Sequence, residues 1–351
     1  MFVAWRDLRA ARGRFALIAG VVALITMLVG FLTGLTGGLA GQNVSAVLGL
    51  DATRIVTSAG AKSFADSTLT ADQVTGWEEH ASGAQVEPLG ISQLRAGSGG
   101  VSDGVAVFGA SAGLDDAVPT ADGSVSLSAA AATALAAQLG GQVEIAGHAY
   151  TVGAVTAEAW YSHTPVVWLT LADWQQLARS TGAGDGAATV LIVRGDTDWA
   201  AVDAATGTQS STPLQALPEI GAFGSEIGSL GLIIGLLFAI SALVVGAFFV
   251  VWGMQRRGDV SILKALGAST WSLRRDSLGQ AAVVLAVGVG VGTGLVVAAG
   301  SALPNAVPFL LSWLTTLVPA ALLILLGLVG AVIALRPVTS ADPLTALGSN
   351  R

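Results

Sequence analysis

Residues 15–40 read FALIAGVVALITMLVGFLTGLTGGLA, a stretch without a single charged side chain. A helix that crosses the hydrocarbon core of a bilayer needs about 20 such residues. Three further runs have a similar length and apolar character, and the chain as a whole is 53% apolar and 11% charged, with a mean hydropathy of +0.71. These values predict a multi-pass membrane protein. The four predicted spans are residues 15–40, 226–253, 278–303 and 307–335.

Four arginines, Arg6, Arg9, Arg12 and Arg14, precede the first run, as basic residues do in a secretory signal. The apolar core of a signal is only about 7–15 residues long, and residues 15–40 exceed that length. We therefore expect the first run to remain as a membrane helix, preceded by a cytoplasmic amphipathic segment.

Basic residues gather in three short segments. Residues 1–14, 254–277 and 336–351 hold four, five and two of the 16 lysines and arginines, whereas residues 41–225 hold five basic and 18 acidic side chains. Short cytoplasmic loops carry the excess of basic residues in membrane proteins. The pattern therefore predicts a plasma-membrane protein with both termini and the loop at 254–277 in the cytoplasm, and an extracytoplasmic domain between the first two helices. The net charge of −7 is the sum of basic cytoplasmic segments and an acidic extracytoplasmic domain, so it says little about partners. Nucleic-acid binding is not expected.

The predicted extracytoplasmic domain has short β-branched or alternating runs separated by Gly, Asp, Ser and Pro, which is typical of an α+β domain. A hydroxyl at Ser126 or Ser128 can cap an Ala-rich helix, and Gly147 marks a turn. Residues 203–218 lack periodicity and predict a linker back to the membrane. The predicted strands are 54–58, 142–145, 150–155, 166–171 and 189–193, and the predicted helices are 70–79, 128–139 and 171–180.

The sequence shows no nucleotide-binding motif. It contains no G-x-x-x-x-G-K-[ST], so the chain is not expected to hydrolyse ATP. It has no cysteine, and its three histidines, His80, His148 and His163, lie in no metal-ligand spacing. We therefore predict no catalytic residue, no metal site and no intrinsic cofactor.

Small residues recur every four positions in the apolar runs, a spacing that lets helix backbones approach closely. Two explanations are open: packing within the chain, or contact of the first two helices with their copies in a homodimer. The small-residue positions are Gly30, Gly34 and Gly38 in the first run, Gly224, Gly228, Gly231 and Gly235 around the second, and Gly288, Gly290, Gly292 and Gly294 in the third.

The loop at 254–277 contains the sequence VSILKALG at residues 260–267. Asp259 can cap a short helix there, and Gly267 can end it. Such an amphipathic helix either anchors in the membrane interface or docks into a groove of a cytoplasmic partner. The residues that would share its apolar face are Val260, Leu263 and Leu266 or Gly267.

This loop resembles the signature RR-x-E-I-x-x-L-K-A-L-G-A-S of the FtsX-like, MacB-type permeases of ABC transporters, with Asp259 where that pattern has Glu. The stretches AWRDLRAARGR at 4–14 and RPVTSADPLTAL at 336–347 are similar to the two ends of these permeases. The order of one helix, a large outer domain and three helices also agrees. The residues that match the loop signature are Arg256, Arg257, Lys264, Ala265, Leu266, Gly267, Ala268 and Ser269, and Ile262 lies two positions after the isoleucine of the pattern.

The resemblance implies a homodimeric permease that carries two copies of a separate cytoplasmic ATPase subunit, which binds the ATP. The loop would be the coupling helix, through which closure of the ATPases is relayed to the first two helices and the outer domains. Substrate would enter from the outer leaflet or the periplasm. The implied coupling residues are Val260, Ile262, Leu263, Lys264, Leu266 and Gly267.

Among these permeases the chain looks most similar to those of haem-efflux transporters of Gram-positive bacteria, because of its compact layout and the stretch WYSHTPVVWLTLADWQQL at residues 160–177. That resemblance implies haem as the transported ligand. Two alternatives remain: export of a lipoprotein, peptide or antibiotic, and mechanical activation of an extracellular partner.

Haem iron takes axial ligands such as Met, His, Tyr or a carboxylate inside an apolar slot. Met27 lies on the helical face of Gly30, and Glu226 lies at the outer end of the second span beside Phe223. We predict Met27, Glu226 and Phe223 as haem-binding residues. The alternatives are that Met27 fills a packing gap and that Glu226 is a solvated residue at a helix N-terminus. His148, Tyr161 and His163 are candidates only if the outer domain folds down to the membrane.

Overall fold

The computed structural model describes residues 12–182, 185–221, 223–255, 267, 269–304 and 307–339. The chain forms two compact units. The first, the helical unit, comprises Met1–Gly38 and Ser229–Arg351, and the second, the inter-helix domain, comprises Leu39–Gly228. The described residues contain four helices that are long and apolar enough to cross a membrane, and an α+β domain lies between the first two of them, which confirms the predicted fold class.

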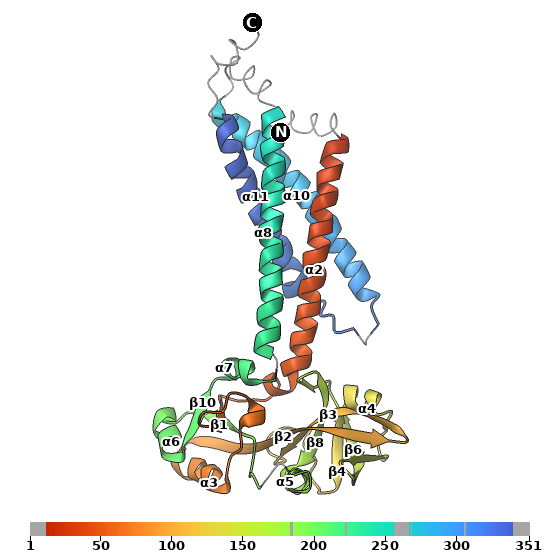
Figure 1. The fold of residues 1–351 in the computed structure, drawn as a ribbon, viewed down its shortest axis with the longest axis vertical. Helices are drawn as coiled ribbons and strands as arrows, with labels where there is room; N and C mark the ends of the chain where they lie inside the picture. The colour runs from red at the N-terminus through yellow and green to blue at the C-terminus, as the bar shows by residue number, and fades with distance from the viewer. Residues whose placement is uncertain are drawn as a thin grey trace. The chain divides into compact units, whose positions relative to one another are not determined.

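The four long helices lie side by side in Figure 1. An α-helix satisfies most of its backbone hydrogen bonds within the segment, which is what a segment in lipid requires. Their bounds are α2 (Arg12–Leu48), α8 (Phe223–Gln255), α10 (Thr270–Ser301) and α11 (Trp313–Thr339). Helix α8 begins at Phe223, before its predicted span, and α2 continues to Leu48, past its predicted end. Residues 39–48 of α2 and 223–228 of α8 belong to the inter-helix domain, so each helix is divided between the two units.

The fourth helix begins later than predicted. Residues 307–312 are not helical, and α11 starts at Trp313, where the Ser312 hydroxyl accepts a hydrogen bond from the Thr315 N–H. Pro308 has no N–H and disfavours helical backbone in the residue before it, which accounts for the extended start. The Leu310 N–H instead donates to the Gly34 carbonyl of α2, at 2.9 Å.

Small residues let α2 and α10 pack closely. An ideal Cβ placed on Gly292 would lie 2.5 Å from the Ala23 carbonyl oxygen, and one on Gly288 would lie 2.8 Å from Val22. Neither position has room for a larger residue. A second cluster joins the beginning of α2 to the end of α8, where the Phe15 and Trp252 rings meet edge to face with centroids 5.9 Å apart.

The inter-helix domain is built on one ten-stranded sheet, in the order β10-β1-β9-β2-β3-β8-β4-β6-β5, with β7 paired to β8. The long strand β2 also pairs with β5, so that β2, β3, β8, β4, β6 and β5 close into a ring. The strands are β1 (Arg54–Ser58), β2 (Ala84–Ser98), β3 (Val101–Ala110), β4 (Ser124–Ser128), β5 (Gln142–Ile145), β6 (His148–Thr156), β7 (Trp160–Tyr161), β8 (Thr164–Thr170), β9 (Val190–Gly195) and β10 (Thr208–Ser211).

Both faces of this sheet are buried, and residues alternate between them with the period of a strand. On β9, Ile192 packs against the cluster that contains Val47 at the end of α2, whereas Leu191 and Val193 pack against the cluster of Trp77. Helices cover the second face, and Figure 1 shows α3 and α5 on the side of the sheet away from α7. The short helices are η1 (Phe64–Asp66), α3 (Ala71–His80), α4 (Ala129–Ala134), α5 (Leu171–Ser180), α6 (Trp199–Thr206), α7 (Pro213–Ala216) and η2 (Leu217–Glu219).

Every predicted strand of this domain is present, and α3, α4 and α5 lie at the predicted helices. The Ser128 hydroxyl caps α4 by accepting from the Ala131 N–H, and Gly147 has the positive φ of a turn residue. The prediction of a linker over residues 203–218 is wrong, because that segment contains the end of α6, then β10 and α7. Its order comes from long-range pairing of β10 with β1, which local periodicity does not reveal.

Candidate ligand site at Glu226

Three polar side chains meet at the start of α8, all within the inter-helix domain. The Asn43 amide nitrogen, Nδ2, donates to Glu226 Oε2 at 2.8 Å. His163 Nε2 lies 2.9 Å from the same carboxylate oxygen and 3.0 Å from Asn43 Nδ2. The structure therefore brings together residues that are 120 and 183 positions from Asn43 along the chain.

Each side chain of this cluster comes from a different element. Asn43 lies on the part of α2 that enters the inter-helix domain and is fully buried. Glu226 lies in the first turn of α8, where the helix dipole favours a negative charge. His163 lies in the turn between β7 and β8, and its side chain is 38% exposed, compared with 23% for Glu226. The cluster is thus open to solvent on the histidine side and closed on the asparagine side.

The turn that carries His163 is held in an unusual backbone conformation. Ser162 and His163 have φ values of 47° and 62°, which are costly for residues with a Cβ. Their N–H groups donate to the Asn43 and Gln42 carbonyls of α2, at 2.9 and 3.0 Å. Gly221 leaves space for this turn, because a Cβ there would lie 2.5 Å from Ser162 Oγ. Backbone hydrogen bonds to α2 therefore fix the imidazole beside Glu226.

Two further groups near this end of the domain have shifted ionisation. Burial raises the pKa of Tyr161, whose ring packs edge to face on Phe108 at 5.4 Å. Burial also raises the pKa of Glu219, in η2, and its Oε2 is buried without a hydrogen-bond partner among the described residues. Both groups favour their neutral forms in the fold.

The other predicted haem residues lie apart from this cluster or in a different unit. Phe223 begins α8 and packs on the core that contains Val44 and Ile220. Met27 is half-buried on α2 in the helical unit, whereas Glu226 belongs to the inter-helix domain. Their joint action as haem ligands stays a prediction. His148 lies at the turn between β5 and β6, opposite Ile145.

The predicted small-residue positions fall into two groups: those where another segment of the chain packs on the glycine, and those where none does. The chain's own segments fill the face of Gly30, Gly34 and Gly38: their ideal Cβ positions meet Val296, Phe309 and the Pro308 carbonyl. Packing within the chain therefore accounts for these three positions. Among the described residues, apart from neighbouring residues of the same helix, no atom lies within 4 Å of the corresponding positions on α8, which are Gly228, Gly231 and Gly235.

Most of the predicted coupling residues, namely Val260, Ile262, Leu263, Lys264 and Leu266, lie outside the described residues. Gly267 is described: it is an exposed turn residue with a φ of 93°, three residues before α10 begins. That conformation suits a glycine that follows a helix.

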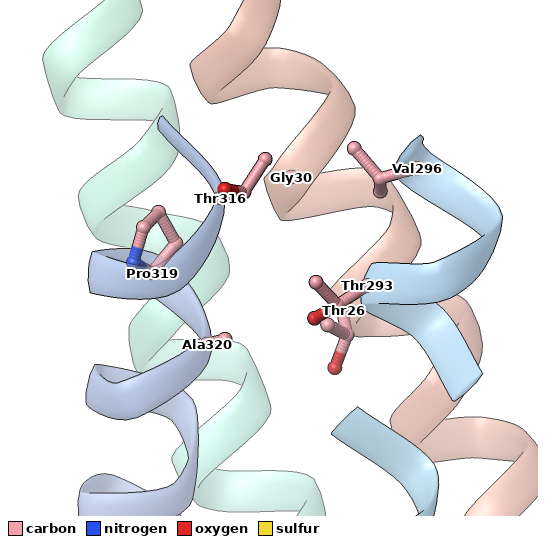
Figure 2. A pocket seen from close by; sticks show the side chains of 7 residues that line it. All are labelled: Thr26, Gly30, Thr293, Val296, Thr316, Pro319 and Ala320. Atoms are coloured by element: carbon pink, nitrogen blue, oxygen red, sulfur yellow. The ribbon is translucent and has the colours of Figure 1, made fainter. Parts of the chain in front are cut away.

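A small cavity lies between three helices of the helical unit, with lining side chains from α2, α10 and α11 (Figure 2). Its volume is about 10 Å³, which is room for one water molecule. A porphyrin does not fit there. The lining residues are Thr26, Gly30, Thr293, Val296, Thr316, Pro319 and Ala320.

Sequence reasoning missed Asn43 as a member of the Glu226 cluster. It lies just past the apolar run, after Gly41 and Gln42, where a polar residue is unremarkable. Only its complete burial distinguishes it. The only signal in the sequence that could have placed Asn43 on the first helix is that the helical pattern of the first span continues as far as this residue.

Residues 231–343, which cover most of α8 and the whole of α10, match the family described as FtsX-like permease C-terminal. This part of the chain therefore carries an FtsX-like permease domain, as the resemblance of the loop at 254–277 to such permeases predicted.

Individual relatives are similar to parts of the chain. The chain is 23% identical over 202 residues to "Putative hemin transport system permease protein HrtB" of Staphylococcus epidermidis, covering 58% of this chain and 56% of the relative. It is 32% identical over 130 residues to the protein of the same name from Staphylococcus haemolyticus, covering 37% of each. The chain thus spans only about half the length of the curated relatives it matches, or less.

Among solved structures, the periplasmic region of MacB from Actinobacillus actinomycetemcomitans aligns with 49% of this chain and 94% of its own length. The sequence identity is 14% and the TM-score is 0.36.

Proposed function

We propose that this chain is the permease subunit of an ABC-type efflux transporter that moves haem out of the membrane. The observation that carries the proposal is the FtsX-like domain together with sequence similarity to two relatives named as hemin transport permeases. The Glu226 cluster supports it, because a carboxylate and an imidazole are both groups that ferric iron accepts.

The proposed partner is a separate cytoplasmic ATPase, present in two copies on a homodimer of this chain. ATP binding and hydrolysis take place on that partner. The open positions Gly228, Gly231 and Gly235 support the dimer, since small residues on a face that the chain leaves uncovered allow close approach of a second helix. The loop at 254–277 is the proposed contact with the ATPase.

Haem binding tests the substrate. We expect the purified chain in nanodiscs to develop a Soret band on titration with micromolar haem, and the band to shift or weaken in Met27→Ala and Glu226→Ala. Met254→Ala is the matched control, since Met254 is the exposed methionine near the end of α8. A chain that shows no Soret band at these concentrations contradicts the substrate.

The ATPase rate tests the mode of action. With the partner subunit present, we expect haem to change the rate of ATP hydrolysis, and Leu266→Glu or Gly267→Glu to remove that response while haem still binds. Ser272→Glu, at an exposed position on α10, is the control. A rate that ignores haem and responds to an extracellular protein would favour mechanical activation of that protein.

A further inference from the structure

The cluster of Asn43, His163 and Glu226 has a geometry that hydrogen bonds alone do not satisfy. Its three polar atoms form a nearly equilateral triangle with edges of 2.8, 2.9 and 3.0 Å. With an ionised carboxylate, the edge to Glu226 needs a proton on His163 Nε2, whereas the edge to Asn43 Nδ2 needs a lone pair on the same nitrogen. One edge is therefore a contact between two donors or between two acceptors.

Asn43 adds a second polar mismatch. Its amide oxygen, Oδ1, is buried and has no hydrogen-bond partner among the described residues. A buried acceptor without a partner costs about 1–3 kcal/mol. A half-turn of the amide exchanges Nδ2 and Oδ1, so that Oδ1 faces Nε2 of His163 and Oε2 of Glu226 while Nδ2 takes the buried position that Oδ1 leaves. In that orientation all three atoms present lone pairs.

Three lone pairs at these separations match one face of an octahedral metal site. At metal–ligand distances of about 2.0–2.1 Å, neighbouring octahedral ligands lie about 2.8–3.0 Å apart. Tetrahedral zinc at similar bond lengths would need about 3.3–3.4 Å. The observed edges therefore fit a cation that prefers six ligands, with water in the remaining positions.

The surroundings hold these ligands in place and leave them accessible. Backbone hydrogen bonds from Ser162 and His163 to α2 fix the imidazole despite the cost of two positive φ values. The side chains of His163 and Glu226 are 38% and 23% exposed, so an ion can reach them from solvent. One neutral nitrogen, one neutral oxygen and one carboxylate form a mixed donor set that suits first-row divalent ions.

We propose that Asn43 Oδ1, His163 Nε2 and Glu226 Oε2 bind one divalent first-row cation in octahedral coordination. The bound ion links the turn between β7 and β8 to α2 and to the first turn of α8. This site goes beyond the proposed function, because it requires no ATPase. It shares Glu226 with the proposed haem ligands, so haem and the cation are expected to compete for that carboxylate.

Manganese binding to the full chain tests this site. The haem-free protein, purified in detergent with a tag that contains no histidine, is titrated with Mn²⁺, and the signal of free Mn²⁺ is followed by electron paramagnetic resonance. We expect saturable binding of one ion per chain, weakened more than tenfold in His163→Ala and in Glu226→Gln. His148→Ala, which changes another histidine of the same domain, should bind as the unchanged chain does.

Asn43→Asp separates a metal site from a hydrogen-bonded cluster. A carboxylate offers an oxygen in either orientation, so we expect about tenfold tighter Mn²⁺ binding and a larger rise in thermal midpoint on adding Mn²⁺ than in the unchanged chain. Without a metal site, Asn43→Asp places two carboxylates side by side, and their repulsion lowers the stability of the fold. Added Mn²⁺ would then not restore that stability.

The site is overturned if the unchanged chain binds no Mn²⁺ saturably, if His163→Ala binds as His148→Ala does, or if Mn²⁺ fails to stabilise Asn43→Asp. Haem binding is followed separately by the Soret band. A missing Soret band therefore counts against the proposed function and leaves the manganese result unaffected.

Discussion

Single glycines on α10 separate a tightly packed face from an open one. A Cβ on Gly292 would lie 2.5 Å from the Ala23 carbonyl oxygen and 2.6 Å from the Thr26 Cβ, whereas no atom lies within 4 Å of the same position on Gly294. The two residues are two positions apart on one helix. The first is therefore constrained by packing and the second only by helix propensity.

We predict opposite effects of alanine at these two positions. Gly292→Ala should lower stability by about 1–3 kcal/mol, because α2 has to move away. Gly294→Ala should leave stability unchanged or raise it slightly, because alanine favours the helix. The thermal midpoints of both variants in detergent measure the difference. Equal midpoints would contradict the packing of α2 on α10.

Glu219 gives a pH-dependent prediction at the residue scale. Its pKa is raised by burial, so this group stabilises the fold fully below its unfolded pKa of about 4.3 and loses that contribution as the pH rises. Glu219→Gln should therefore raise the thermal midpoint at pH 7 and have little effect near pH 4. The gain should be no more than about 1 kcal/mol, because solvent screens the partly exposed group. Glu79→Gln, at an exposed carboxylate of α3, is the matched control.

Among the elements, α2 and α11 are joined by a hydrogen bond that a proline makes necessary. Pro319 has no N–H, so the Thr315 carbonyl one turn earlier has no donor within α11. The Thr33 hydroxyl of α2 lies 2.9 Å from that carbonyl oxygen. Proline is tolerated in membrane helices when a neighbouring hydroxyl satisfies the freed group in this way.

A double-mutant cycle tests that link. Thr33→Val should lower stability by about 0.6–1.7 kcal/mol, the range of hydrogen bonds between membrane helices. In a Pro319→Ala background, α11 supplies its own N–H and the cost of Thr33→Val should fall. Thr36→Val is the control, since its hydroxyl donates to the Leu32 carbonyl of its own helix. An identical cost in both backgrounds would remove the proposed role of Pro319.

The sheet shows why two long strands escaped sequence reasoning. Strands β2 and β3 contain Gly90 and Gly109, which weaken a strand pattern and pair opposite each other. Both lie against the Trp174 side chain of α5, because a Cβ on either would be 2.1 Å from it. Glycine is needed at both positions because the Trp174 side chain of α5 packs directly on the strands there. That contact is between residues far apart in the sequence, so the sequence pattern does not show it.

For the whole molecule, the distribution of charge predicts how the chain lies in the membrane. The chain has no cysteine, so single cysteines can report accessibility. We expect Ser180→Cys, on the inter-helix domain, to react with a membrane-impermeant maleimide on intact cells. Ser272→Cys, at the start of α10, should react only after the membrane is permeabilised. The reverse pattern would contradict the predicted orientation.

Hydropathy and the motif of the inner loop were sufficient to predict the four membrane helices and the FtsX-like permease domain. In lipid every backbone group has to be satisfied within its own segment, so a long apolar run is sufficient evidence for a helix. The positions of some domain strands were also predictable, since β1 and β9 are short apolar runs, whereas their order in the sheet was not predicted.

Only the tertiary structure decided where the polar groups meet. Asn43, His163 and Glu226 are distant in sequence and come together because α2 runs into the inter-helix domain and a strained turn hydrogen-bonds to its carbonyls. No local pattern encodes a contact between three separate elements. Glu226 was predictable from its place at a helix start, whereas its partners depend on packing that forms only when the sheet, α2 and α8 are assembled.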